Sequence, residues 1–284
     1  MTRGSIDDRA ASAAKTQPRS LMSEVKNNDL LLALDIGNTY IHLGLFEGED
    51  LIIRRKLSSL QTRTPDEAGI LVKLLCQDSG VDPKDLRGVG IASVAPWTGQ
   101  VYAEMSLSYL GHRPFFVHGE LPGFDNRYRN PKAVGADRVS NAVAGYELVK
   151  GPLLVLDFGT AITFDVINRD GAYLGGVIMP GLENSARMLK KTTALLPEAR
   201  LKVPDAVIGV TTDHSIQAGL VRGTIHALRG LIADLREEMG EPEAAVIATG
   251  GMARVVVPHL PEVERIVPDL VLDGIRMLYD RHSE

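Results

Sequence analysis

Cysteine and tryptophan are the scarcest residues in this chain of 284 residues, with one of each. The single cysteine, Cys76, excludes an internal disulfide and any metal site built from several thiolates. It lies in an apolar helical pattern, so we expect it in the core. The seven histidines also lack the spacing of metal ligands. A chain without disulfides suits the reducing cytoplasm, where we expect it to work.

Long apolar runs and a strong excess of one charge are missing too. No run reaches the length of a membrane span, so no membrane partner is expected. The formal net charge is −5, and this mild acidity argues against nucleic acid as a partner. Residues 1–29 lack the apolar core of a secretory signal and are rich in small and charged residues. They predict a disordered tail, with Met22 as an alternative start.

Several well-known catalytic patterns are absent as well. The chain has no Walker A lysine loop, no GxGxxG following a strand and no nucleophile elbow. Phosphoryl transfer by this chain would therefore need neither a P-loop nor a covalent intermediate.

A pattern of strand, polar turn and returning strand occurs twice. Residues 31–47, LLALDIGNTYIHLGLFE, form the first copy, and residues 153–167, LLVLDFGTAITFDVI, form the second. A third strand follows each copy. Repetition of a long supersecondary pattern indicates a duplicated domain. We place the two domains at 30–150 and 151–284.

Each turn combines a carboxylate, a glycine and a hydroxyl at the mouth of a buried strand. Exposed backbone N–H groups can bind phosphate oxygens there, and an aspartate can hold Mg²⁺. Facing turns from two domains would grip a nucleotide from both sides. One Asp-x-Gly-x-Thr turn is usually an ordinary hairpin, whereas two copies in the same context favour nucleotide binding.

Helices and strands alternate after the first three strands. The run Thr64-Pro65-Asp66-Glu67 predicts a helix that starts with a capping box. Its apolar face is assigned to Ile70, Leu71, Leu74 and Leu75. Residues 88–94 and 246–251 are typical of buried strands. The result is an α/β plan with mixed sheets.

The densest polar stretch is residues 128–138. An aspartate at a helix start, here Asp137, is usually a cap. Alternatively Asp137 accepts the proton of an attacking alcohol, while Arg138 and Tyr128 contact an anionic, hydroxyl-bearing substrate. Two other features are equally open. The glycines within 175–181 indicate either a ligand or tight strand packing, and Thr211 and Thr212 either cap a helix or favour an anion.

Together these residues resemble the type III pantothenate kinase family, a branch of the actin-like ATPase and sugar-kinase superfamily. The resemblance runs from about Leu30 to the C-terminus. The matching elements are residues 35–39, 135–138, 157–161, 175–176 with 180–181, 193–197, and Gly209 with Thr212 and Gly219. Gly-Ala-Asp-Arg placed before Asp-Phe-Gly-Thr-Ala is specific to this family within the superfamily.

The resemblance implies a fold of duplicated ribonuclease H-like (actin-like ATPase) domains, each a mixed sheet flanked by helices, with a cleft between them. It implies that ATP phosphorylates the primary hydroxyl of pantothenate to give 4′-phosphopantothenate, the first step of coenzyme A synthesis. Mg²⁺ accompanies ATP, and a monovalent cation, K⁺ or NH₄⁺, is required. Members of the family are homodimers with the substrate site near the subunit interface.

The resemblance also implies roles for individual residues. Asp137 would be the catalytic base. ATP would contact Asp35, Ile36, Gly37, Asn38, Thr39, Tyr40, Ile41, His42 and Thr160. Pantothenate would contact Tyr128, Gly135, Ala136, Asp137, Arg138 and Thr212. Asp35 would organise Mg²⁺, and Asp157 would hold the monovalent cation.

Three positions depart from the family pattern. Tyr40 replaces a common second Asn, Val139 replaces a bulkier residue, and Val210 replaces a common Lys. None of them removes a proposed catalytic group. Two other functions stay open: a kinase for another small alcohol or acid, and a non-catalytic regulatory relative. The presence of all three acids favours catalysis.

Overall fold

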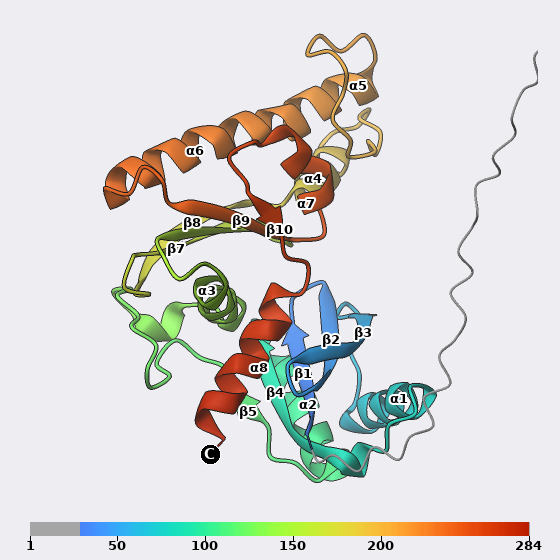
Figure 1. Ribbon diagram of the computed structural model, residues 1–284. Coiled ribbons are helices and arrows are strands. Elements are labelled where there is room, and N and C mark those ends of the chain that lie inside the picture. The colour runs from blue at the N-terminus through green and yellow to red at the C-terminus, as the bar shows by residue number, and fades with distance from the viewer. Residues whose placement is uncertain (1–28, 284) are drawn as a thin grey trace, which may run out of the picture.

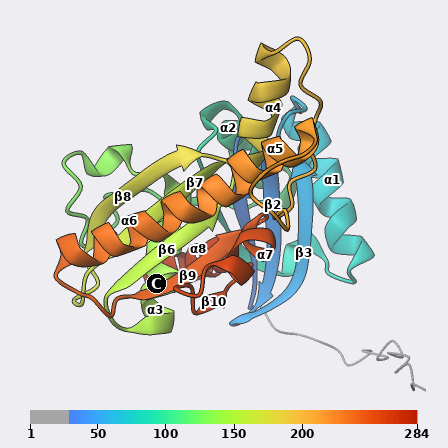
Figure 2. The same cartoon turned by 90° about the horizontal axis from the view of Figure 1, so that it is seen from above.

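The protein is described by a computed structural model that covers residues 29–283 (Figure 1). The predicted tail, apart from Asp29, lies outside these residues. Two five-stranded mixed sheets form the framework, and helices cover their faces (Figures 1 and 2). Among residues 29–283, no helix has the length and apolar character that a membrane crossing requires.

The two sheets share one topology. The first consists of β1 (Leu30–Ile36), β2 (Tyr40–Glu47), β3 (Asp50–Ser58), β4 (Leu86–Ser93) and β5 (Phe115–Phe116), in the order β3-β2-β1-β4-β5. The second consists of β6 (Leu153–Phe158), β7 (Ala161–Ile167), β8 (Tyr173–Pro180), β9 (Ala245–Gly250) and β10 (Arg265–Ile266), in the order β10-β9-β6-β7-β8. Read from the opposite edge, the second order matches the first strand for strand. The duplicated α/β architecture is thus confirmed.

The helices are α1 (Pro65–Asp78), α2 (Pro96–Met105), α3 (Ala136–Val149), α4 (Leu182–Thr192), α5 (Thr212–Gln217), α6 (Gly223–Met239), α7 (Ala253–Val256) and α8 (Leu270–His282). The predicted capping box of α1 is present: the Glu67 backbone N–H donates to Thr64 Oγ1 (3.2 Å), and the Thr64 backbone N–H donates to the Glu67 carboxylate (2.8 Å). One π-helical turn, Ser106–Leu110, extends α2, and another, Ala218–Arg222, joins α5 to α6.

The predicted apolar face of α1 is right for two of its four residues. Leu71 and Leu75 are partly buried, and Leu75 packs against the core, whereas Ile70 and Leu74 are exposed. The buried stripe consists of Ala68, Val72 and Cys76, spaced four residues apart. The cause is close packing. A Cβ atom on Gly69 would lie 2.3 Å from the Tyr109 ring, so small residues set how this helix approaches its neighbours.

The helices α3 and α8 lie between the two sheets (Figure 1). α3 comes after β5 and contacts β4 of the first sheet as well as β6 and β7 of the second, while α8 comes after β10 but contacts β1, β2 and β4 of the first. The division between the domains at 150/151 stays a prediction.

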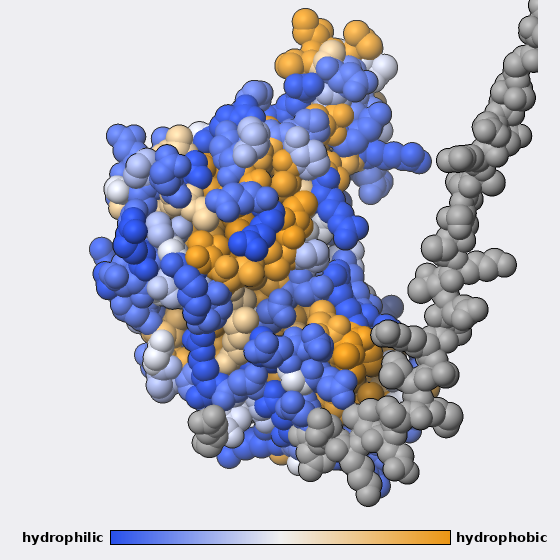
Figure 3. Space-filling view, in the orientation of Figure 1, coloured by the Kyte–Doolittle hydropathy of each residue, from blue (hydrophilic) through white to orange (hydrophobic). Residues whose placement is uncertain are grey.

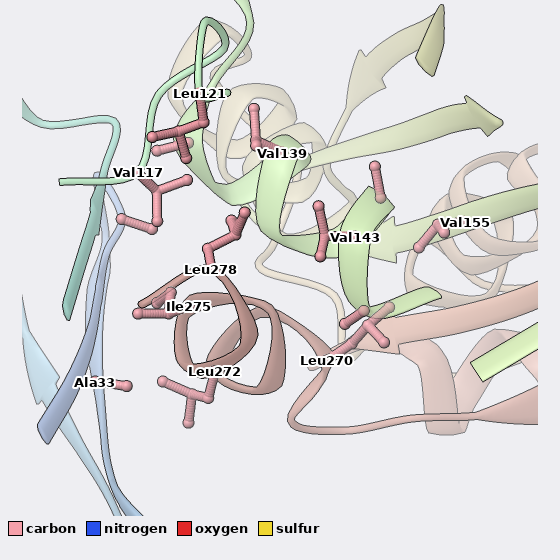
Figure 4. Close-up of a cluster of buried hydrophobic side chains, with 14 of the residues drawn as sticks. Ala33, Val117, Leu121, Val139, Val143, Val155, Leu270, Leu272, Ile275 and Leu278 are labelled. Atoms are coloured by element: carbon pink, nitrogen blue, oxygen red, sulfur yellow. The ribbon is translucent and has the colours of Figure 1, made fainter. Parts of the chain in front are cut away.

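An apolar cluster fills the junction between these helices. Val139 and Val143 of α3 lie in one cluster with Leu272, Ile275 and Leu278 of α8 (Figure 4). The backbones come closest beside Gly274, where an added Cβ would lie 2.1 Å from the Ser140 carbonyl oxygen. A glycine is therefore required at this crossing.

Gly274→Ala should lower the free energy of unfolding by about 2 kcal/mol, because the new methyl group meets backbone. The better helix propensity of alanine offsets only part of this cost. Chemical denaturation measures the change.

Gly230→Ala is the matched control. Gly230 lies inside α6, and an added Cβ there meets nothing within 4 Å among the described residues. This variant should gain about 0.5–1 kcal/mol. Equal stability of the two variants would contradict the role assigned to Gly274.

Candidate active site

The two repeated turns meet, as their pattern predicts. In the first, the Gly37 N–H donates to the Tyr40 carbonyl (2.9 Å); in the second, the Gly159 N–H donates to the Ala161 carbonyl (3.0 Å). The hydroxyls of Thr39 and Thr160 lie 3.0 Å apart and share a hydrogen bond. Residues 121 positions apart in the chain thus join the two halves at the predicted nucleotide site.

The predicted ATP segment, residues 35–42, spans the end of β1, the turn and the start of β2. Asp35 and His42 are paired across the two strands, with His42 Nδ1 3.1 Å from Asp35 Oδ2. Ile36 and Ile41 are fully buried, so neither has surface open to a ligand. Tyr40 is exposed. The Lys56 Nζ atom lies over the Tyr40 ring, 3.4 Å from the ring centre.

Asp137 does not cap α3. Gly135 occupies the N-cap position and Ala136 is the first helical residue. The Asp137 Oδ1 atom accepts a hydrogen bond from the Arg138 backbone N–H (2.8 Å). A Cβ on Gly135 would lie 2.5 Å from the same oxygen. The glycine therefore makes room for the carboxylate at the start of the helix.

Three carboxylates influence one another beside the two turns. Burial, and then the charge of Asp35, raises the pKa of Asp137 to about 6. Burial, and then the charge of Asp137, raises the pKa of Asp157 to about 7. The charges of Asp35, Asp137 and Asp157 therefore act on one another across the ends of β1, α3 and β6. No trio of His, Cys, Asp or Glu side chains within residues 29–283 forms a metal site by itself. A divalent ion here would need phosphate and water oxygens as well.

Asn141 belongs to this cluster, and sequence reasoning missed it. Its Nδ2 donates to Asp157 Oδ2 (3.0 Å), and its side chain is fully buried. Gly250, with φ of +89°, leaves space on the other side of the carboxylate, since a Cβ there would lie 2.6 Å from Asp157 Oδ1. Asn141 follows Asp137 by four residues and so shares its helix face, which was the available signal.

Arg138 is buried, and hydrogen bonds hold its guanidinium group in place. Its Nε donates to Asp165 Oδ1 (2.7 Å), and its Nη2 donates to the Phe164 carbonyl (2.8 Å). The Tyr173 hydroxyl donates to the same Asp165 oxygen (3.1 Å). A Cβ on Gly176 would lie 1.7 Å from the Phe164 oxygen and 2.6 Å from Arg138 Nη2. At Gly176, tight strand packing is therefore the reason for glycine.

Tyr128 lies next to this network. Its ring is 6.4 Å from that of Tyr173, and a Cβ on Gly175 would lie 3.5 Å from it. The ring is 38% exposed. The structure therefore brings Tyr128 close to Arg138, with one edge open to a ligand.

Thr212 lies elsewhere. It is the first residue of α5 and is exposed; Thr211 is the N-cap and accepts a hydrogen bond from the His214 N–H (3.2 Å). α6 lies on one face of the second sheet and α3 on the other, while α5 lies beyond the end of α6 (Figures 1 and 2). Thr212 is therefore not placed beside Asp137 by the elements that carry the two residues.

Comparison with protein families adds a finding of its own. A family model described as type III pantothenate kinase matches residues 31–234. A Moorella thermoacetica protein of that name is 42% identical over 255 residues, which cover 89% of this chain and 100% of the relative. A Geobacter sulfurreducens protein of that name is 40% identical over 256 residues, which cover 90% of this chain and 100% of the relative.

Comparison with solved structures supports the fold alone. A Campylobacter jejuni protein named as a Baf family transcriptional activator superposes with a TM-score of 0.57 at 18% identity and covers 89% of this chain and 98% of its own. A Listeria monocytogenes protein named as an N-acetylmannosamine kinase gives a TM-score of 0.53 at 12% identity and covers 90% of this chain and 100% of its own.

The clustered carboxylates predict an unusual dependence of stability on pH. Their folded pKa values lie above the usual 3.8, so the folded state binds more protons than the unfolded state between about pH 4 and 7. The free energy of unfolding of the ligand-free protein should therefore fall across this range, by on the order of 2–4 kcal/mol. Thermal denaturation at a series of pH values measures it.

Asp157→Asn removes the charge while keeping the shape, so it should raise the melting temperature at pH 8 and flatten the pH profile. Asp170→Asn, in an exposed turn, is the control and should change neither. A wild-type profile that rises from pH 4 to 7 would contradict the assigned burial of charge.

Proposed function

The chain belongs to the type III pantothenate kinase family, and from this membership we propose that it transfers the γ-phosphate of ATP to the primary hydroxyl of pantothenate. The product is 4′-phosphopantothenate, the first intermediate of coenzyme A synthesis. One observation carries the proposal: the two repeated Asp-x-Gly-x-Thr turns face each other, with the threonine hydroxyls 3.0 Å apart. Because the phosphate donor is ATP, we assign the reaction to the cytoplasm.

The proposed role of Asp137 is to orient the attacking hydroxyl and accept its proton. A pKa of about 6 leaves this carboxylate ionised at neutral pH and close to the value that suits a general base. Its second task is positioning, because phosphoryl transfer depends mainly on alignment and on neutralisation of charge. The Arg138 N–H fixes one carboxylate oxygen at 2.8 Å, which limits how the carboxylate can turn.

The phosphates are proposed to bind at the two turns. The backbone N–H groups of Asn38 and Thr39 and the hydroxyls of Thr39 and Thr160 supply donors there, while the Gly37 N–H closes the turn. Closely placed donors of this kind stabilise charge that develops during transfer. The rest of the proposed ATP segment supports this arrangement by holding Asp35 and His42 together at 3.1 Å.

The residues present fit the cations that the family implies. Carboxylate oxygens are preferred ligands of Mg²⁺, and hard oxygens also suit K⁺. Burial and the charges of neighbouring carboxylates raise the pKa values of Asp137 and Asp157. A bound cation would therefore lower the free-energy cost of ionising these two side chains. We propose Asp35 for Mg²⁺ and Asp157 for K⁺ or NH₄⁺. When bound, these ions would neutralise phosphate charge.

Pantothenate is proposed to bind between Tyr128 and residues 135–138. Arg138 contributes as a fixed positive charge, since its guanidinium is held by Asp165 and Phe164. The half-open ring of Tyr128 supplies an apolar wall and a hydroxyl. Such a site selects an acid that also carries an alcohol.

The position of Thr212 supports a homodimer. Thr212 is exposed on α5, which packs on the π-helical turn that follows it, and we propose that Thr212 contacts the pantothenate bound by a second copy. Exposed apolar residues gather in this region on β8, α4 and the segment before α5: Ile178, Met188, Leu195, Val207, Ile208 and Val210. Figure 3 shows hydrophobic atoms at the top of the molecule, around α5. We propose that this surface pairs two chains.

ADP release by the purified protein tests the proposal. With ATP and Mg²⁺, release should require pantothenate and should be faster in K⁺ or NH₄⁺ than in Na⁺. Asp137→Asn should lower turnover by roughly 10²–10⁴-fold, the range for a lost general base, while ATP binding stays largely intact. Near-normal turnover in this variant would remove Asp137 as the base. ADP release that requires a different alcohol, and does not occur with pantothenate, would show that the proposed substrate is wrong.

Ile208→Asp tests the dimer. Ile208 is 82% exposed, and a charge there should turn the dimer into a monomer in analytical ultracentrifugation. Activity should fall with it, because each site loses the partner's threonine. Ile70→Asp on α1, where the parent side chain is 63% exposed, is the control and should leave the dimer intact. A monomeric wild type, or dissociation by the control alone, would overturn this surface.

A further inference from the structure

Asn141 makes one hydrogen bond, and that bond goes to the proposed cation ligand. Its Nδ2 donates to Asp157 Oδ2 at 3.0 Å. Its Oδ1 is buried and has no hydrogen-bond partner within residues 29–283. The Asn141 Nδ2 atom is therefore hydrogen-bonded to the carboxylate, whereas the Oδ1 atom of the same amide has no hydrogen bond among these residues.

This arrangement is not explained by packing. A buried acceptor without a partner costs free energy, and an apolar side chain of similar shape would avoid that cost. The next buried polar residue on the helix differs in this respect, since Ser140 Oγ donates to the Ala136 carbonyl at 2.9 Å. An amide that is kept at a cost to the fold indicates a role in the site.

The hydrogen bond from Asn141 holds Oδ2 of the Asp157 carboxylate. Gly250 leaves room for Oδ1, because a Cβ at that position would lie only 2.6 Å from it. Asn141 also stands one helical turn after Asp137, so both side chains share a face of α3. One rigid helix thus carries the proposed base and the group that orients the proposed cation ligand.

We propose that Asn141 is a positioning residue. It holds the Asp157 carboxylate in the orientation that a monovalent cation needs, and it fixes the position of this carboxylate relative to that of Asp137. The proposal rests on the proposed function for its link to catalysis. Its link to cation binding can be tested without turnover.

Asn141→Leu is the main variant, because leucine keeps the volume and removes both the donor and the unsatisfied oxygen. The concentration of K⁺ that gives half the thermal stabilisation, measured with choline as the replacement cation, should rise about tenfold or more, the usual effect of a lost hydrogen bond to a charged group. In choline alone, the variant should be as stable as the wild type or more so. In the ADP assay, the K⁺ needed for half-maximal rate should rise equally, with kcat at saturating K⁺ changed much less.

Two further variants serve as controls for the K⁺ response. Asp157→Ala should lose the K⁺ response altogether. Ser106→Ala removes another buried polar side chain, one that donates to the His112 carbonyl (2.7 Å); it should lower stability and leave the K⁺ response unchanged.

The outcomes separate the two proposals. An Asn141→Leu protein that is less stable but responds to K⁺ like the wild type would give Asn141 a purely structural role and overturn the inference. A wild type that K⁺ does not stabilise would overturn it too. A wild type that is stabilised by K⁺ but releases no ADP with pantothenate would defeat only the proposed function, because the Asn141 effect on K⁺ binding would still be measured.

Discussion

The crossing of α3 and α8 is the contact on which the rest of the structure depends. Their backbones nearly touch where Gly274 faces Ser140. α8 packs on the first sheet, while α3 contacts β6 and β7 of the second sheet and β4 of the first. α3 therefore carries Asp137 between Asp35, at the end of β1, and Asp157, at the end of β6.

The buried face of α3 is polar near the start of the helix and apolar near its end. Near its start, Arg138 and Asn141 donate hydrogen bonds to Asp165 and Asp157 of the second sheet. Near its end, Gly145 lies against Leu153, Val155 and Ile247 (a Cβ there would be 2.8, 2.9 and 3.4 Å from them). The apolar part anchors the helix, and the polar part carries buried charge at a cost in stability. Such a cost is common where a site needs charge that the fold alone would not keep.

The sequence pattern predicted the duplication, both turns and the capped start of α1, because strand periodicity and cap chemistry are local. It did not predict the burial of Asp165 or the role of Asn141. Alternation along β7 separates its two faces but cannot tell a face open to water from one covered by a second helix, and α3 covers this one. The exposed half of the predicted α1 face has a related cause, since close approach at Gly69 outweighs the size of Ile70 and Leu74. Thr212 could be matched to a motif, but its place on α5, beyond the end of α6, depends on the whole topology.

The charges of the site explain why a kinase of this kind would need two sorts of cation. Asp137 and Asp157 repel each other, and together with burial this repulsion raises the pKa of Asp157 to about 7. Both carboxylates cannot be fully ionised at neutral pH unless positive charge stands nearby. In the proposed function, Asp157 would hold a monovalent cation, whose charge would favour the ionised form of Asp137 that accepts the alcohol proton. Asp35 would hold Mg²⁺, which would neutralise phosphate charge. Charge balance within one buried cluster thus links the cation requirement to the proton transfer.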